Sequence, residues 1–106
     1  MQLSSKQRAY LKKISNDLKP VVRVGKGGLD SNIAKSVNDA ITKKELIKVK
    51  ILENSEESKR EVADFIAKET NSEVVQVIGR VIILFKENVI LALQTNKHFA
   101  FFVCVL

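Results

Sequence analysis

The stretch that decides the fold of this chain is Val21-Val22-Arg23-Val24-Gly25-Lys26-Gly27-Gly28-Leu29-Asp30-Ser31. Its first four residues are a short, mostly β-branched run, which is typical of a strand. Three of the next four are glycines, and Asp30 or Ser31 can cap a following helix. The loop combines exposed amides, the cation Lys26 and a helix N-terminus. These are the parts of a site that binds phosphate.

The segment before this stretch has the pattern of a helix. Ser4-Ser5-Lys6-Gln7 fits a capping box, and Pro20, the only proline, ends the helical region. Apolar residues recur at helical spacing at Tyr10, Leu11, Ile14 and Leu18. On a 3.6-residue wheel, four cations fall away from that stripe: Lys6, Arg8, Lys12 and Lys13.

Two further helices and a strand are predicted after the glycines. The second helix has an apolar face made of Ile33, Val37, Ala40 and Ile41. Residues 45–52 then alternate, which predicts a half-buried strand with Lys48 and Lys50 facing outward. A third helix is expected to begin at Ser55-Glu56-Glu57, to bury Val62, Phe65 and Ile66, and to end near Thr70-Asn71.

The last predicted elements form a hairpin. Residues 74–78 and 81–85 are apolar runs joined by Gly79-Arg80, a link that suits a type II′ turn. The element order is therefore α-β-α-β-α-β-β. The βαβ crossovers predict parallel pairs, and the hairpin adds an antiparallel strand. We expect an α/β chain of the α+β two-layer type with a mixed four-stranded sheet.

The composition limits the class of protein. A chain of 106 residues is the size of one domain, and 45% hydrophobic content suffices for one core. The single cysteine excludes an intramolecular disulfide, which fits a reducing compartment such as the cytoplasm. The start, MQLSSKQRAY, does not read as a signal peptide, and no stretch has the apolar length of a membrane span. Neither a membrane nor a small-molecule substrate is expected.

The excess positive charge lies at one end of the chain. The net charge is +6; residues 1–28 hold seven lysines and arginines and one acid, whereas residues 29–106 hold eleven residues of each sign. The cations therefore gather in the segment that ends with the glycine loop. This distribution favours a polyanionic partner, although a solvated lysine-rich helix face would give the same count.

The loop matches neither common nucleotide motif. It lacks the GxxxxGK[ST] of a Walker A loop and the GxGxxG of a dinucleotide site. The remaining physical use of a GxxG loop is that of KH domains, in which it clamps the backbone of single-stranded nucleic acid.

Four motifs together resemble one family. They are Leu18-Lys19-Pro20-Val21-Val22, Gly25-Lys26-Gly27-Gly28-Leu29, Glu45-Leu46-Ile47-Lys48-Val49-Lys50 and Val75-Gln76-Val77-Ile78-Gly79-Arg80. In order and spacing they resemble the YhbY-like, CRM-domain RNA-binding proteins (chloroplast RNA splicing and ribosome maturation). The resemblance runs from about Leu3 to Lys86.

The resemblance implies a fold and a partner. The family fold is similar to the C-terminal domain of the third translation initiation factor, with a mixed four-stranded sheet. It implies binding of structured RNA and, for stand-alone bacterial members, association with precursors of the large ribosomal subunit. With the cations found above, the predicted RNA-binding residues are Gly25, Lys26, Gly27, Gly28, Lys6, Arg8, Lys12, Lys13, Lys19, Arg23, Lys48 and Lys50.

The last twenty residues depart from the family. Residues 1–86 are expected to form the CRM-like RNA-binding domain, whereas residues 87–106 add an apolar tail that ends in Phe101-Phe102-Val103-Cys104-Val105-Leu106. The tail could be an extra strand, a dimer contact or a sequence outside the native fold.

The sequence bears on three other functions: catalysis, DNA recognition and protein interaction. Catalysis is disfavoured because the only histidine, His98, and the only cysteine, Cys104, both lie in the tail. The acids Glu53, Glu56, Glu57 and Glu61 read as a solvated helix start, so neither a metal nor a cofactor is expected. A DNA reader would need a recognition helix with base-reading side chains, and none is evident. A protein-interaction module that uses the basic helix and the apolar tail stays open as the alternative.

Overall fold

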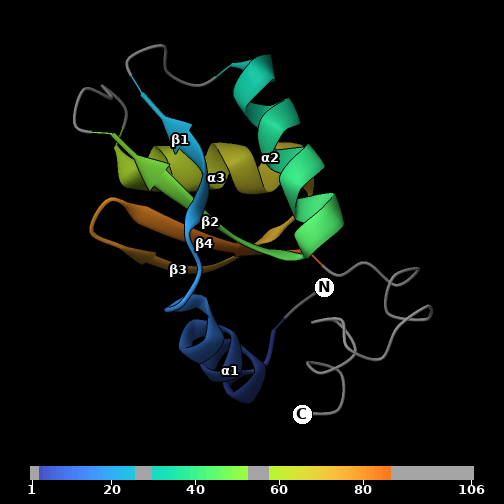
Figure 1. Cartoon of the computed structure of the whole chain (residues 1–106), viewed down its shortest axis with the longest axis vertical. Coiled ribbons are helices and arrows are strands. Elements are labelled where there is room, and N and C mark those ends of the chain that lie inside the picture. The colour runs from blue at the N-terminus through green and yellow to red at the C-terminus, as the bar shows by residue number, and fades with distance from the viewer. Residues whose placement is uncertain (1–2, 26–29, 53–57, 87–106) are drawn as a thin grey trace.

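A computed structural model of the chain describes residues 3–25, 30–52 and 58–86. Within these residues it contains three helices and four strands in the predicted order (Figure 1). Their bounds are α1 Ser5–Ser15, β1 Pro20–Val24, α2 Ser31–Lys44, β2 Leu46–Ile51, α3 Lys59–Thr70, β3 Glu73–Ile78 and β4 Val81–Phe85. The predicted helix boundary near the N-terminus is confirmed: Ser4 and Gln7 form the reciprocal capping box.

The sheet is mixed, as predicted, with the strand order β1-β2-β4-β3. β1 and β2 are parallel, and β4 is antiparallel to both β2 and β3. The expectation that each crossover gives a neighbouring parallel pair is wrong for α3, because β4 lies between β2 and β3. Four of the five residues of β4 are buried, so it takes an interior place, and β3, with Ile78 exposed, lies at the edge.

One face of the sheet is covered by α2 and α3. Alternate residues of the two central strands, such as Val49 and Ile82, pack against Val37 and Ile66 of the helices. The apolar face predicted for α2 is confirmed, since Val37 and Ile41 are buried and Ile33 and Ala40 pack against the same core. This cluster is the main core of the domain.

The opposite face is covered only in part, by α1. Leu11 of α1 and the nearby Leu3 are buried against Leu46, Ile83 and Phe85 of the sheet. Figure 1 shows α1 at one end of the sheet, whereas β1 and β2 run away from it. The fold class and the mixed four-stranded sheet predicted from the sequence are confirmed, and α1 adds a partial third layer to them.

The start of α3 was predicted too early. The helix begins at Lys59, and the Ser58 hydroxyl accepts a hydrogen bond from the Glu61 amide at 3.2 Å, so Ser58 is the cap. The predicted start, residues 55–57, lies outside the described residues. The predicted end is confirmed: Asn71 takes the left-handed conformation, φ 56°, just after Thr70.

Two local backbone features shape the β3–β4 hairpin. In the β3–β4 link Gly79 has φ +56°, and Arg80 does not share a positive φ, which agrees with the predicted II′ turn. In β3 the register with β4 shifts between Val74 and Gln76, so Val75 is an extra residue. Because of this bulge, Val75 and Gln76 both lie on the α1 side of the sheet.

Candidate nucleic-acid interface

We call the part of the sheet face that α1 leaves uncovered the open half; it includes the carboxyl ends of β1 and β2. Arg23 and Lys50 are register partners in the parallel pair. The residues on either side of each are buried against α2 and α3, so both cations project from the opposite, open face and both are exposed. Neighbouring strands lie about 4.8 Å apart. The Arg23 and Lys50 side chains therefore leave the backbone next to each other.

Arg80 joins this end of the sheet from the hairpin turn. The Ile51 amide donates to the Arg80 carbonyl at 2.7 Å, and the Arg80 guanidinium donates to the Leu52 carbonyl at 3.3 Å. Arg80 is not among the RNA-binding residues predicted from the sequence, because the hairpin pattern places β4 beside β3 and gives no sign that β4 also pairs with β2. We call Arg23, Lys50 and Arg80 the strand-end cations.

The glycine loop leaves from the same edge. The Leu52 amide donates to the Val24 carbonyl at 2.8 Å, which continues the parallel ladder up to Gly25, and Asp30 then caps α2 by accepting from the Ile33 amide at 2.9 Å. Gly25 is half-buried. Lys26, Gly27 and Gly28 lie outside the described residues, so their predicted role stays a prediction. The loop therefore begins, at Gly25, at the end of the sheet that carries the strand-end cations.

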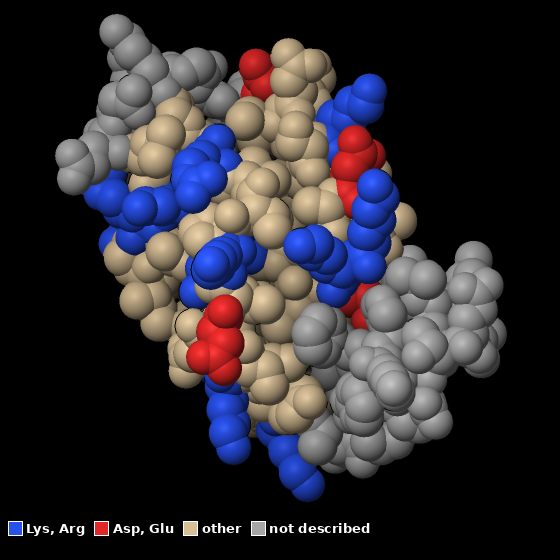
Figure 2. Space-filling model, in the orientation of Figure 1, with Lys and Arg blue, Asp and Glu red and all other residues tan. Residues whose placement is uncertain are grey.

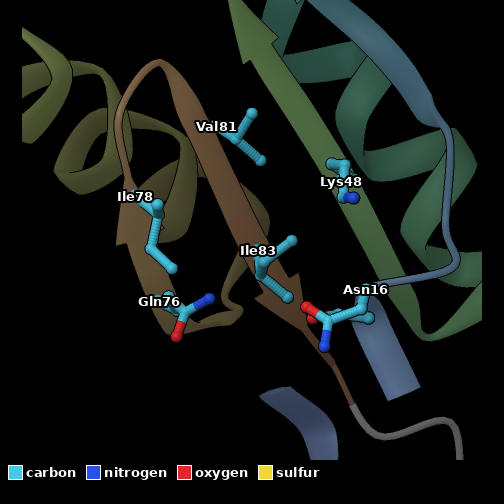
Figure 3. Close-up of a pocket in the computed structure, with 7 residues that line it drawn as sticks. Asn16, Lys48, Gln76, Ile78, Val81 and Ile83 are labelled. Carbon is cyan, nitrogen blue, oxygen red and sulfur yellow. The ribbon is translucent and has the colours of Figure 1, made fainter. Parts of the chain in front are cut away.

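Lys48 lies two residues before Lys50, nearer to α1. It was expected to face outward, and it does lie on the open face, but it is only half exposed. It lines a hollow of about 190 Å³ together with Ser15, Asn16, Gln76, Ile78, Val81 and Ile83 (Figure 3). The end of α1 therefore meets the open half of the sheet at Lys48.

The cations of α1 divide into two groups. Lys6, Lys12 and Lys13 are exposed, as predicted from the wheel, and so is Lys19 just after the helix. Arg8 was predicted to lie away from the sheet, and this is wrong: its Nη1 donates to the carbonyls of Val74 and Val75 at 2.6 and 2.9 Å. Position 8 is one turn before the fully buried Leu11, which turns it toward β3.

The carbonyls that Arg8 binds are those of the β3 bulge. A bulge disrupts the ladder locally and leaves backbone groups in need of another partner. Arg8 supplies that partner for Val74 and Val75, so its described contacts are structural.

The exposed cations differ in whether a carboxylate lies close to them. Figure 2 shows lysine and arginine side chains spread over the visible face, with acidic side chains among them, down to the end where α1 lies. α2 and α3 mix acids with their cations, and Arg60 and Asp64 of α3 form an exposed ion pair at 3.5 Å. In the described part of the chain, Arg23, Lys48 and Lys50 have no carboxylate within ion-pair distance.

Neither a metal-ligand cluster nor a membrane-spanning helix is found among the described residues. They contain no group of three or more histidine, cysteine, aspartate or glutamate residues able to hold a metal ion. None of their helices combines the length and the apolar character needed to cross a bilayer.

Comparison with protein families now identifies the fold. The family model of the CRS1/YhbY (CRM) domain matches residues 3–86. The chain belongs to the CRM-domain family. The match covers all of the described secondary structure, and it agrees with the resemblance seen in the sequence motifs.

Two named relatives of this CRM domain come from bacteria. It is 42% identical over 86 residues to the "Probable RNA-binding protein YqeI" of Bacillus subtilis, covering 81% of this chain and 90% of the relative. It is 36% identical over 84 residues to a protein of Haemophilus influenzae named "RNA-binding protein", covering 79% and 85%.

A solved structure has the same fold. The solution structure of the hypothetical protein SAV1595 from Staphylococcus aureus superposes with a TM-score of 0.70 at 38% sequence identity, covering 82% of this chain and 91% of that one. The α1 layer, the mixed sheet and the α2–α3 layer are therefore the CRM fold, and the open half of the sheet is the surface of this CRM domain that remains to be explained.

Proposed function

We propose that this CRM domain binds structured RNA by its phosphate backbone, using the strand-end cations, Lys48, Lys19 and the Gly25–Gly28 loop. The observation that carries the proposal is the pairing of Arg23 with Lys50 on the open face, at the edge from which the loop leaves. The family and the names of two relatives support RNA as the polymer.

The physical basis is that these cations have no carboxylate partner among the described residues that would compete with phosphate. An exposed cation that already has a carboxylate partner must give it up to bind phosphate, whereas Arg23, Lys48 and Lys50 have none among the described residues. The glycines of the loop carry no side chain, so an RNA backbone can approach the loop amides closely. The exposed lysines of α1, Lys6, Lys12 and Lys13, extend the same charge along the molecule.

The salt dependence of RNA affinity tests the proposal. If about five cations contact phosphates, log K falls with log[salt] with a slope of about −4 to −5 on a duplex-like RNA and less on a single strand. Changing Gly27 or Gly28 to a bulky residue weakens binding while the circular dichroism spectrum is kept. A flat salt response would reject phosphate binding, and unchanged affinity of the glycine variants would reject the clamp.

The finer proposal concerns ribosome assembly. We propose that the RNA is ribosomal RNA in precursors of the large subunit and that the protein acts in the cytoplasm, as the resemblance to stand-alone bacterial members implies. Gradient fractionation of cell extracts should place the protein with large-subunit precursors. Its presence only in the free fractions would contradict this role. RNA binding itself is tested separately, by the salt dependence.

A further inference from the structure

We infer that the hollow between the end of α1 and the open half of the sheet binds one unpaired nucleobase, an inference that rests on the proposed RNA binding. The hollow is lined by Ser15 and Asn16 at the end of α1, Lys48 of β2, Gln76 and Ile78 of β3, and Val81 and Ile83 of β4. No motif in the sequence brings these residues together.

The size of the hollow limits its occupant. Its volume of about 190 Å³ is below the range of about 300–1,000 Å³ that is usual for pockets that enclose a whole small molecule. A complete nucleotide cofactor is therefore too large for it. A single planar group that enters from the surface, such as one base of a longer RNA, is of the right class.

The lining has the two chemistries that a base requires. The side chains of Ile78, Val81 and Ile83 are apolar, and flipped-out bases commonly lie against apolar side chains. The amides of Asn16 and Gln76 each offer two donors and an acceptor. Figure 3 shows these two amides on either side of Ile83, so hydrogen-bonding groups flank an apolar centre. In the described part of the chain neither amide group has a hydrogen-bond partner.

The cations around the hollow favour RNA as the source of the base. Lys48 lines the hollow itself, and Lys50 follows on the same face, about 6.6 Å further along β2 at the usual rise per residue. Pro20 pairs with Lys48, so the exposed Lys19 lies at the same level of the sheet. A phosphate backbone that follows these cations passes the hollow, where a base with no pairing partner can turn in.

The β3 bulge explains why the hollow exists. The extra residue, Val75, packs under α1, and the strand then continues with Gln76 and Ile78 on the same face. Arg8 holds the bulge through the Val74 and Val75 carbonyls. The Ser15 hydroxyl donates to the Lys12 carbonyl at 2.8 Å, so Ser15 is already engaged and Asn16 is the polar group left at this side.

The test compares two RNAs and two variants. The RNAs have equal numbers of phosphates: a hairpin with an unpaired loop carrying 2-aminopurine, and a fully paired duplex. The double variant is Gln76→Ala with Ile78→Ala. The fold should tolerate it, because Ile78 is 59% exposed in the wild-type domain. The control is Val21→Ala, since Val21 is an apolar residue of β1, 39% exposed, that does not line the hollow.

The wild-type protein should prefer the hairpin to the duplex and should change the 2-aminopurine fluorescence. The double variant should lose about 5- to 10-fold in hairpin affinity, the size expected for one hydrogen bond with a small apolar contact. Its affinity for the duplex should equal that of the wild type. The Val21→Ala variant should behave as wild type. Wild-type binding to both RNAs with a ratio that the double variant leaves unchanged would overturn the base site and keep RNA binding. Failure of the wild type to bind either RNA would overturn the proposed function itself.

Discussion

The two faces of the sheet differ in what covers them. One face is closed by α2 and α3, and alternate residues of β1, β2 and β4 there are almost all fully buried. The other face is closed only under α1, and beyond Lys48 its strands carry exposed cations. β2 belongs to both: Ile47, Val49 and Ile51 stabilise the core, whereas Lys48 and Lys50 are free for a ligand. The main core therefore lies on one face, and the proposed RNA-binding surface is the part of the other face that α1 leaves uncovered.

The largest test of this comparison uses two adjacent residues of β4. Ile82 points into the main core and Ile83 points toward α1 and the hollow, and they differ little in exposure. Ile82→Ala should cost about 3–4 kcal/mol of unfolding free energy and Ile83→Ala about 2 kcal/mol, because less protein packs against Ile83. Urea denaturation measures both. Equal losses would contradict the view that the α1 face is the weaker of the two.

A second test reverses two charges on the open face and, as a control, two charges on α2. Reversing Arg23 and Lys50 to glutamate should weaken RNA binding by about 50-fold at low salt, close to 2.3 kcal/mol, and should lower the steepness of the salt dependence. Reversing Lys43 and Lys44, exposed in the last turn of α2, is the matched control and should have only a small effect. Similar losses for the two pairs would mean that net charge, and not the open face, determines binding.

A third test concerns the attachment of α1. Arg8→Ala should destabilise the domain by about 1–2 kcal/mol, because two carbonyls of the β3 bulge lose a charged donor. Lys12→Ala, on the exposed side of the same helix, should change stability by less than about 0.5 kcal/mol. Should the two variants prove equally stable in denaturant, Arg8 would be a surface cation, as the helical wheel predicted.

The smallest test compares the two helix caps. Ser4→Ala and Asp30→Ala should each cost about 1 kcal/mol, since each side chain accepts a hydrogen bond from a first-turn amide. Hydrogen exchange should show where the cost falls. In Ser4→Ala, faster exchange should be confined to α1, whereas in Asp30→Ala it should extend to the main core. The same pattern of exchange in both variants would contradict the separate attachment of α1.

Local sequence patterns predicted the elements well. The capping box at Ser4, the cap at Asp30, the apolar face of α2 and the glycine of the hairpin turn each depend on residues within a few positions of one another. Such patterns are visible in the sequence because their physics is local. The predicted start of α3 was wrong because Ser55 and Ser58 are both capping residues followed by a glutamate, so the local pattern does not distinguish them. The packing of the domain selects Ser58.

The non-local features could not be predicted in this way. The place of β4 between β2 and β3 depends on which strand buries more surface, and that is decided by the assembled sheet. The contact of Arg8 with the bulge, the position of Arg80 beside Leu52 and the hollow around Ile83 all follow from that placement. The charge pattern predicted a polyanion-binding surface, and the proposed position of that surface on the open half of the sheet depends on the same placement of β4.

The central position of β4 also affects how the chain folds during synthesis. β2 is made early, yet one of its edges remains unpaired until residues 81–85 leave the ribosome and the β3–β4 hairpin docks as a unit. Pairs so distant in sequence raise the contact order and slow folding. We expect nascent chains that stop before β4 to remain sensitive to protease, because neither face of the sheet can be completed without that strand.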